Sequence, residues 1–260
     1  MRRIAKTNFV FANGGKPSAC GRMLAVATCL ALVPDISPAG PVTPLATMPM
    51  ARHDLLNVEA NAEVVALMTG LILIERDLLL GKLFDSDGMV SAEGSHFTHP
   101  RQTAFPLIKD GLAKAGAPDL EPLLIALEQA TDKDAIGTAY LAVMTGLKKA
   151  KSALQPTEYD VMAAVVQATE GVITLIDASG TTQVAAYQDA WALLIVARGQ
   201  LDLLVRGSDP VVKKSATKMA LAIDDVIVVA PDPAASAPVP FDPALVINLL
   251  SILKSEKGAA

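Results

Sequence analysis

Apolar residues recur at intervals of three and four along most of the sequence after residue 53, and this spacing limits the fold more than any other feature. The strongest stretch extends from Asp54 to Lys82, and Asp54 is placed to cap its first turn. Its apolar residues at helical spacing are Val58, Ala62, Val65, Met68, Ile72 and Leu79. From Val64 to Ile74 almost every residue is apolar, so this helix should lie at the centre of the fold.

Proline, glycine and capping residues divide the remaining sequence into further helices. We expect helices at Pro100–Ala115 with a bend near Pro106, and at Asp119–Ala130, Thr131–Leu154, Thr157–Asp177, Thr182–Val205 and Ser208–Val229, with a short helix from Asp242. No segment alternates apolar and polar residues over a length that would form a sheet. Only 4% of the residues are aromatic, while alanine, leucine and valine dominate, which also favours helices. The sequence therefore predicts an all-α fold, an antiparallel helical bundle of about seven to eight helices.

The predicted organisation has five segments. They are a signal peptide at 1–39, a flexible leader at 40–52, the helical bundle at 53–230, a linker rich in proline and alanine at 231–241, and a short terminal helix and tail at 242–260. An alternative organisation has two small helical units that divide near Gln155 and Pro156.

The amino terminus has the layout of a secretory signal peptide. Five basic residues and no acidic residue precede the apolar run Met23–Val33, and the small-residue site Ser37-Pro38-Ala39 follows it. Cleavage after Ala39 would remove both cysteines, and the mature protein would then have no thiol and no disulfide. The sequence therefore predicts a periplasmic or secreted protein, while the alternative interpretation of the apolar run is a short buried helix.

The charge of the mature chain excludes one class of partner. Cleavage removes five of the 22 basic and one of the 27 acidic residues, which leaves 17 basic and 26 acidic side chains and a net charge of −9. Such a surface repels nucleic acid. The longest apolar runs, Met23–Val33 and Val64–Ile74, have about eleven residues, whereas a bilayer requires about 20. We therefore expect no nucleic-acid partner and no transmembrane span in the mature chain.

Two histidines lie close together in the segment from Glu93 to Pro100. The imidazoles of His96 and His99, three residues apart at a helix entrance, can converge on one cation, and Glu93 can add an oxygen ligand. This donor set suits Zn, Cu, Ni or Fe better than Ca or Mg. In the alternative interpretation, one histidine caps the helix and the other packs beside Phe97.

Arg198 is the second unusual residue, because it falls on an apolar stripe of its expected helix. That stripe consists of Val184, Tyr187, Trp191, Leu194, Leu201 and Val205. Burying a guanidinium without a partner is costly, so a carboxylate should meet it. The candidates are Asp202, one turn away, and Glu75 and Glu170 within apolar helices. Either the arginine extends its charged end to solvent or forms a buried ion pair that fixes the register of the helices, or it binds an anion.

No sequence motif assigns a catalytic residue. The chain contains no G-x-S-x-G, no H-E-x-x-H, no P-loop and no dinucleotide fingerprint. Two functions of different class follow from the sequence. One is a periplasmic binding protein for a transition metal or small ligand, without catalysis. The other is a helical accessory protein that docks on another protein of the cell envelope.

Part of the chain resembles a known group of proteins. His-Phe-Thr-His-Pro at 96–100, the break Gly116-Ala117-Pro118 and the acidic helix after it resemble an uncharacterised family of secreted proteobacterial helical proteins with a His-Phe-x-His-Pro signature. Tyr-Gln-Asp-Ala at 187–190 is also similar to a segment of that family. The resemblance implies a helical, extracytoplasmic protein and no particular activity. In that family a further histidine follows a glycine of the first helix, but here Leu71 follows Gly70, so a site with three histidines is not expected.

Gly94 and His96 also resemble the Gly-x-His-x-x-Glu motif of imelysin-type periplasmic proteins. His99 stands where that motif has glutamate, and the resemblance therefore implies no peptidase activity for this chain.

Overall fold

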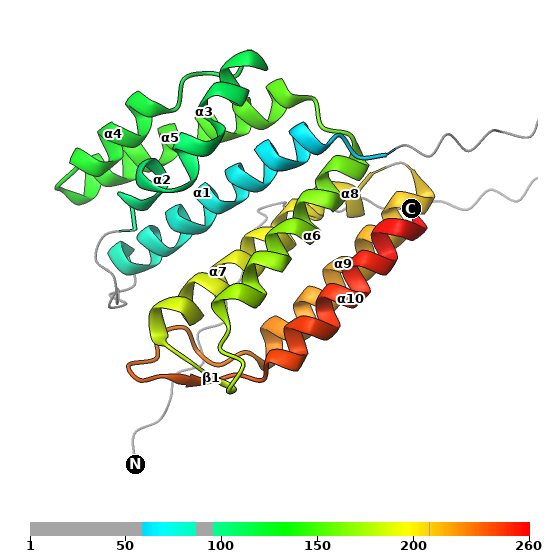
Figure 1. Cartoon of the computed structure of the whole chain (residues 1–260). Coiled ribbons are helices and arrows are strands. Elements are labelled where there is room, and N and C mark those ends of the chain that lie inside the picture. The colour runs from blue at the N-terminus through cyan, green and yellow to red at the C-terminus, as the bar shows by residue number, and fades with distance from the viewer. Residues whose placement is uncertain (1–58, 87–95, 208) are drawn as a thin grey trace, which may run out of the picture. The chain divides into compact units, whose positions relative to one another are not determined.

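The computed structural model describes residues 59–86, 96–207 and 209–260 (Figure 1). The expected signal peptide and leader, the capping residue Asp54 and the candidate ligand Glu93 lie outside these residues.

The long apolar stretch forms α1 (Ala62–Ser86). Asn61 caps its first turn, because the Oδ1 atom of Asn61 accepts hydrogen bonds from the backbone amides of Glu63 and Val64. The amide of Asn61 itself donates to the Oδ1 atom of Asp160 at 2.6 Å, which ties the start of α1 to a distant helix.

The all-α fold expected from the sequence is confirmed. The further helices are α2 (His99–Gln102), α3 (Ala104–Lys114), α4 (Glu121–Gln129), α5 (Lys133–Leu154), α6 (Glu158–Leu175), α7 (Val184–Gln200), α8 (Asp202–Val205), α9 (Pro210–Val229) and α10 (Pro243–Ala259). Two short strands, β1 (Thr181–Thr182) and β2 (Val239–Pro240), pair antiparallel. Among the described residues, α2 and α8 are single turns and the other eight helices have nine or more residues each.

Two expected helices are divided differently from the sequence interpretation. The helix expected at 100–115 breaks at Thr103 rather than bending at Pro106. Pro106 falls in the first turn of α3, where the missing amide removes no helical hydrogen bond. The helix expected at 182–205 is interrupted at Leu201, whose amide donates to the carbonyl oxygen of Arg198 three residues back and so tightens the last turn of α7.

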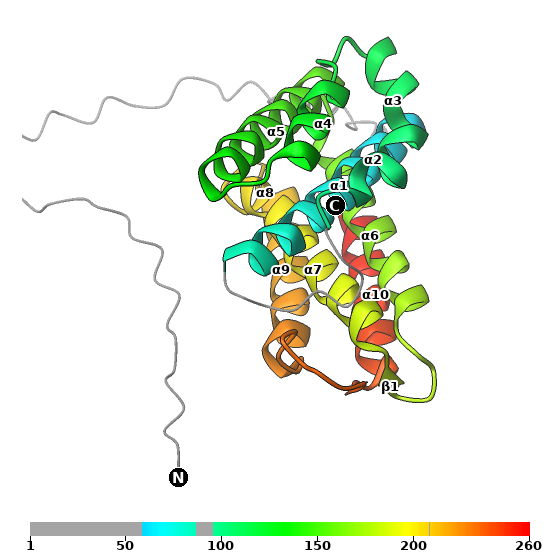
Figure 2. The same cartoon turned by 90° about the vertical axis from the view of Figure 1, so that its left-hand side faces the viewer.

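Helix α1 lies between two groups of helices (Figures 1 and 2). It packs against α2, α3 and α5 on one side and against α6 and α7 on the other. Helix α4 packs on α5, while α9 pairs with α10, and α10 also contacts α6. Leu71, Ile72 and Ile74 of α1 have no exposed surface, so the prediction that this helix is central is confirmed. All described residues belong to one compact unit, His53–Ala260.

The segment between α9 and α10 is held against the bundle by hydrogen bonds. The Tyr187 hydroxyl donates to the carbonyl oxygen of Pro231 at 2.5 Å, and the Gln188 amide donates to that of Pro233 at 3.0 Å. The amide of Phe241 donates to the carbonyl oxygen of Gly180, beside the pairing of β1 with β2. These contacts position α10, which buries an apolar face made of Val246, Leu249 and Leu253.

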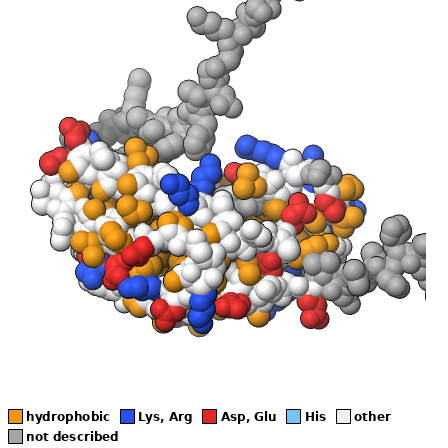
Figure 3. Space-filling view, turned by 90° about the horizontal axis from the view of Figure 1, so that it is seen from above, with side chains coloured by type: hydrophobic (Ala, Val, Ile, Leu, Met, Phe, Trp, Pro, Cys, Tyr) orange, Lys and Arg blue, Asp and Glu red, His pale blue; other side chains and the backbone are white. Residues whose placement is uncertain are grey.

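Figure 3 shows one face of the molecule, on which basic, acidic and hydrophobic side chains are interspersed. None of the helices in the described segments combines the length and the apolar character that crossing a membrane requires.

Candidate metal site

Three consecutive charged residues interrupt the apolar sequence of α1. Glu75, Arg76 and Asp77 lie between Ile74 and Leu78, both of which are completely buried. Successive helical residues are rotated by roughly 100°, so the three side chains leave the helix in different directions. Asp77 lies near the segment that enters α2, Arg76 lies near α7, and Glu75 lies near both α5 and α7.

A glycine allows the histidine segment to approach α1. Phe97 is buried directly against Gly81, where an added Cβ would lie 2.5 Å from the Cε1 atom and 2.6 Å from the Cδ1 atom of the ring. Only glycine leaves room for this ring. Because Gly81 lies one turn beyond Asp77, the docking of Phe97 brings His96 beside the carboxylate of Asp77.

His96, His99 and Asp77 together form a potential metal site. One ligand atom from each of the three residues lies within 4.8 Å of the others. The ring centroids of the two histidines are 4.6 Å apart, and Phe84 packs 4.9 Å from the centroid of His96. Asp77 has no exposed surface and His96 only 2%. Two polar atoms in this site, Nδ1 of His96 and Oδ2 of Asp77, have no hydrogen-bond partner among the described residues.

The surroundings perturb both titratable groups. Burial raises the pKa of Asp77 to about 6, although the neighbouring guanidinium of Arg76 opposes this shift. Burial also lowers the pKa of His96 to about 4, and the charges of His99 and Arg76 act in the same direction. At neutral pH the carboxylate is therefore ionised and the imidazole is neutral, which are the forms that bind metals.

Arg76 supplies the positive charge next to Asp77 in this structure. Its Nη2 and Nε atoms lie 2.6 Å and 2.9 Å from the Oδ1 atom of Asp77. The Nε atom also lies 3.8 Å from the Oδ1 atom of Asp189 on α7. The guanidinium occupies only one oxygen of Asp77, so Oδ2 is the oxygen that faces no protein donor among the described residues.

The donor set fits a transition metal. Two imidazole nitrogens and one carboxylate oxygen form the 2-His-1-carboxylate set found in non-haem Fe(II) proteins, and imidazole also suits Zn, Cu and Ni. Three ligands leave further coordination positions for water or another ligand.

Asp77 was absent from the residues singled out in the sequence. A signal for it exists, because a charged triplet in the middle of an apolar helix must find buried partners. The structure brings His96 and His99 together, as a metal site requires, and supplies the carboxylate from α1. Glu93, the carboxylate considered from the sequence, lies outside the described residues.

The residues considered around Arg198 divide among three separate groups of ion pairs. Arg198 itself donates to Asp202 at 2.6 Å and to Asp224 on α9 at 2.9 Å. Glu75 instead accepts from Lys151 at 2.6 Å, and Glu170 pairs with Lys254 of α10 at 2.8 Å. Arg198 therefore joins α7, α8 and α9, and its guanidinium is already shared by two carboxylates.

Comparison of this chain with known protein families, with curated proteins and with solved structures found no match. The two family resemblances described above remain predictions from the sequence.

Proposed function

We propose that this is an exported helical protein that binds a transition metal ion, Zn, Cu, Ni or Fe, through Asp77, His96 and His99 in the periplasm or outside the cell. The observation that carries the proposal is the convergence of these three ligand atoms within 4.8 Å in a buried position. The role proposed is binding without catalysis, since the sequence contains no hydrolase motif.

Packing alone does not account for the arrangement. The rings of Phe84 and His99 pack against the His96 ring at centroid distances of 4.9 Å and 4.6 Å. They leave Nδ1 of His96 and Oδ2 of Asp77 without a partner among the described residues. A buried polar atom left unsatisfied costs about 1–3 kcal/mol, and a metal ion between these atoms would remove this cost.

The test is metal analysis of the protein purified from a periplasmic extract, followed by thermal unfolding with Zn, Cu, Ni and Fe(II) added one at a time. A bound ion stabilises the folded state by about 2.7 kcal/mol at a concentration one hundred times its Kd, so the expected result is a clear rise in Tm with at least one metal. The variants Asp77→Asn, His96→Ala and His99→Ala should each remove this rise.

The third histidine of the chain provides the matched control. His53→Ala should leave the metal-dependent rise in Tm unchanged, because the proposed ligands are Asp77, His96 and His99. No metal in the purified protein together with no change in Tm at saturating metal would refute the proposal.

One observation favours a second candidate function, docking on another envelope protein. Leu221 and Val228 are 58% and 81% exposed on α9, and their spacing of seven residues places them on one face of the helix. A photo-crosslinking residue at position 228 should give a discrete adduct in cells, whereas one at Thr138, exposed on α5, should not. Equal labelling from both positions would argue against docking through α9.

A further inference from the structure

A cavity of about 620 Å³ lies on the other side of α1 from the candidate metal site, between α1, α5, α6, α7 and α8. Glu75 lines it, and Glu75 is two residues, or roughly 200° of helical rotation, away from Asp77. Its apolar wall is formed by Met68, Met144, Val161 and Leu204. A cavity of this volume with a mostly apolar lining and a few polar groups is typical of a site for a small molecule.

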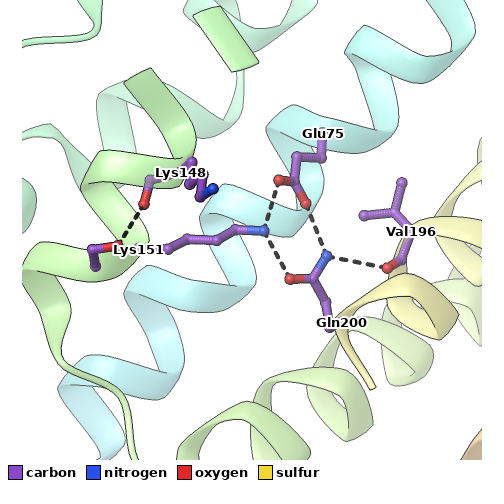
Figure 4. A network of polar contacts seen from close by, with 6 residues as sticks. Glu75, Lys148, Lys151, Val196 and Gln200 are labelled. Atoms are coloured by element: carbon purple, nitrogen blue, oxygen red, sulfur yellow. Dashed lines mark hydrogen bonds and ion pairs between the residues drawn. The ribbon is translucent and has the colours of Figure 1, made fainter. Parts of the chain in front are cut away.

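A closed network of hydrogen bonds fixes the polar end of the cavity (Figure 4). The ammonium of Lys151 donates to the Oε1 atom of Glu75 at 2.6 Å and to the side-chain oxygen of Gln200 at 2.7 Å. The Gln200 amide in turn donates to the other carboxylate oxygen of Glu75 at 2.9 Å and to the carbonyl oxygen of Val196 at 3.2 Å. The charge of Lys151 is therefore compensated, and these side chains are held in place before any ligand arrives.

Lys148 contributes a second positive charge to the same wall. It lies one turn before Lys151 on α5, and both lysines line the cavity. Within the part of the chain that the structure describes, the Lys148 ammonium forms no ion pair. The Lys148 side chain is exposed, and Glu158 of α6 also lines the cavity, so an anion would lie on the Lys148 side of it.

We propose that this cavity binds a small amphipathic anion, a monocarboxylate with an aliphatic body. The carboxylate would lie on the ammonium of Lys148, and the body would pack between Met68, Met144 and Val161. Methionine side chains adapt to ligands of different shape, which suits an aliphatic body of variable form. The site is separate from the proposed metal site, and the proposal does not depend on metal binding.

Gly199 offers a way to fill the cavity without disturbing the helix. It lines the cavity on α7, yet a Cβ added there would meet no atom within 4 Å. A leucine at this position would therefore extend into open space rather than into the backbone. Gly137 in α5 also has no atom within 4 Å of an added Cβ and does not line the cavity, so Gly137→Leu is the matched control.

The experiment measures the binding of decanoate, decanol and decyltrimethylammonium to the purified protein by calorimetry. These probes share one alkyl chain and differ in the charge of the head group. The expected result is one decanoate bound per chain, decanol bound at least about tenfold more weakly, and no binding of the cation. Lys148→Met, which keeps the apolar stem, should reduce decanoate binding to the level of decanol. Gly199→Leu should abolish binding of both, and Gly137→Leu should change neither.

Methyl NMR of labelled methionines locates the ligand independently of any variant. Decanoate should shift the methyl resonances of Met68 and Met144, which line the cavity, and leave those of Met162 and Met219, which are buried elsewhere. Shifts confined to Met162 or Met219 would refute the proposal that decanoate binds in this cavity. Decanoate binding that survives in a folded Gly199→Leu protein would refute it as well. Equal affinity for decanoate and decanol, or no binding of decanoate, would refute the proposal that the ligand is an aliphatic monocarboxylate.

Discussion

The substitution Gly81→Ala tests whether close packing of Phe97 on α1 positions the histidines. The added methyl group would lie 2.5 Å from the Cε1 atom of Phe97, whereas an ordinary contact between carbon atoms requires at least about 3.5 Å. The ring must therefore move by about 1 Å, and the neighbouring residue His96 moves with it.

Two opposing terms decide the effect of Gly81→Ala on stability. Overpacking a buried position costs about 1–3 kcal/mol, while alanine is favoured over glycine within a helix by about 1 kcal/mol. We expect a net loss of about 1 kcal/mol in the free energy of unfolding, and a fall of about tenfold in metal affinity, because a site displaced by about 1 Å binds poorly. Gly137→Ala, where an added Cβ meets nothing, should instead stabilise the protein by about 1 kcal/mol.

The assay is urea unfolding followed by circular dichroism, with metal binding measured by calorimetry on the same samples. Replacing Phe97 with leucine removes the ring, so Gly81→Ala should cost less in a Phe97→Leu background than in the native protein. The reasoning would be refuted if Gly81→Ala stabilised the protein as much as Gly137→Ala and left the metal affinity unchanged.

Three further predictions concern single side chains. Arg76→Met removes a cation beside Asp77 and should raise metal affinity by about tenfold in calorimetry; unchanged or weaker binding would contradict this. Burial raises the pKa of Tyr187 from 10.0 to about 12, so the folded state favours the neutral phenol. The resulting contribution to the free energy of unfolding is fully present below pH 10 and is lost as the pH rises through 12. In urea titrations, Tyr187→Phe should therefore lose less stability between pH 10 and pH 12 than the native protein, and equal losses would oppose this assignment. Thr157→Ala breaks the capping box of α6 and should lower the free energy of unfolding by about 1 kcal/mol, whereas Thr138→Ala, at an exposed position of α5, should not.

Local signals account for the helix boundaries that the sequence revealed. Thr157 caps α6 by accepting from the amide of Asp160 three residues later. Asp209 and Asp242 cap α9 and α10 by accepting from backbone amides two or three residues later. Such bonds join residues that are neighbours in the sequence, so a short segment is enough to recognise them. The fold class follows for the same reason, since the period of the apolar residues is a local property.

Partners between helices were much harder to predict. The candidate ion-pair partners of Arg198 in the sequence were Glu75, Asp202 and Glu170. The second partner of Arg198 is instead Asp224, which the packing of α9 on α8 and α7 brings close. The carboxylate beside His96 comes from Asp77 of α1, 19 residues earlier, whereas His96 lies in the turn before α2. Which carboxylate meets which cation depends on the relative rotation and position of whole helices, and no sequence spacing encodes either.

The metal site and the cavity share α1, and a double variant tests whether they are also independent. Glu75 bonds only with Lys151 and Gln200 among the described residues, while Asp77 bonds with Arg76, so the two acids have no common partner. Substitutions without shared partners usually add within about 0.5 kcal/mol.

We therefore expect the loss in unfolding free energy for Glu75→Gln and that for Asp77→Asn to sum to the loss of the double variant, measured without metal. Glu75→Gln should also preserve the metal-dependent rise in Tm that Asp77→Asn removes. If Glu75→Gln reduced that rise, or if the double variant departed from the sum by more than about 1 kcal/mol, α1 would transmit changes between its two sides. The polar residues Glu75 to Asp77 would then form one coupled unit rather than serving two separate sites.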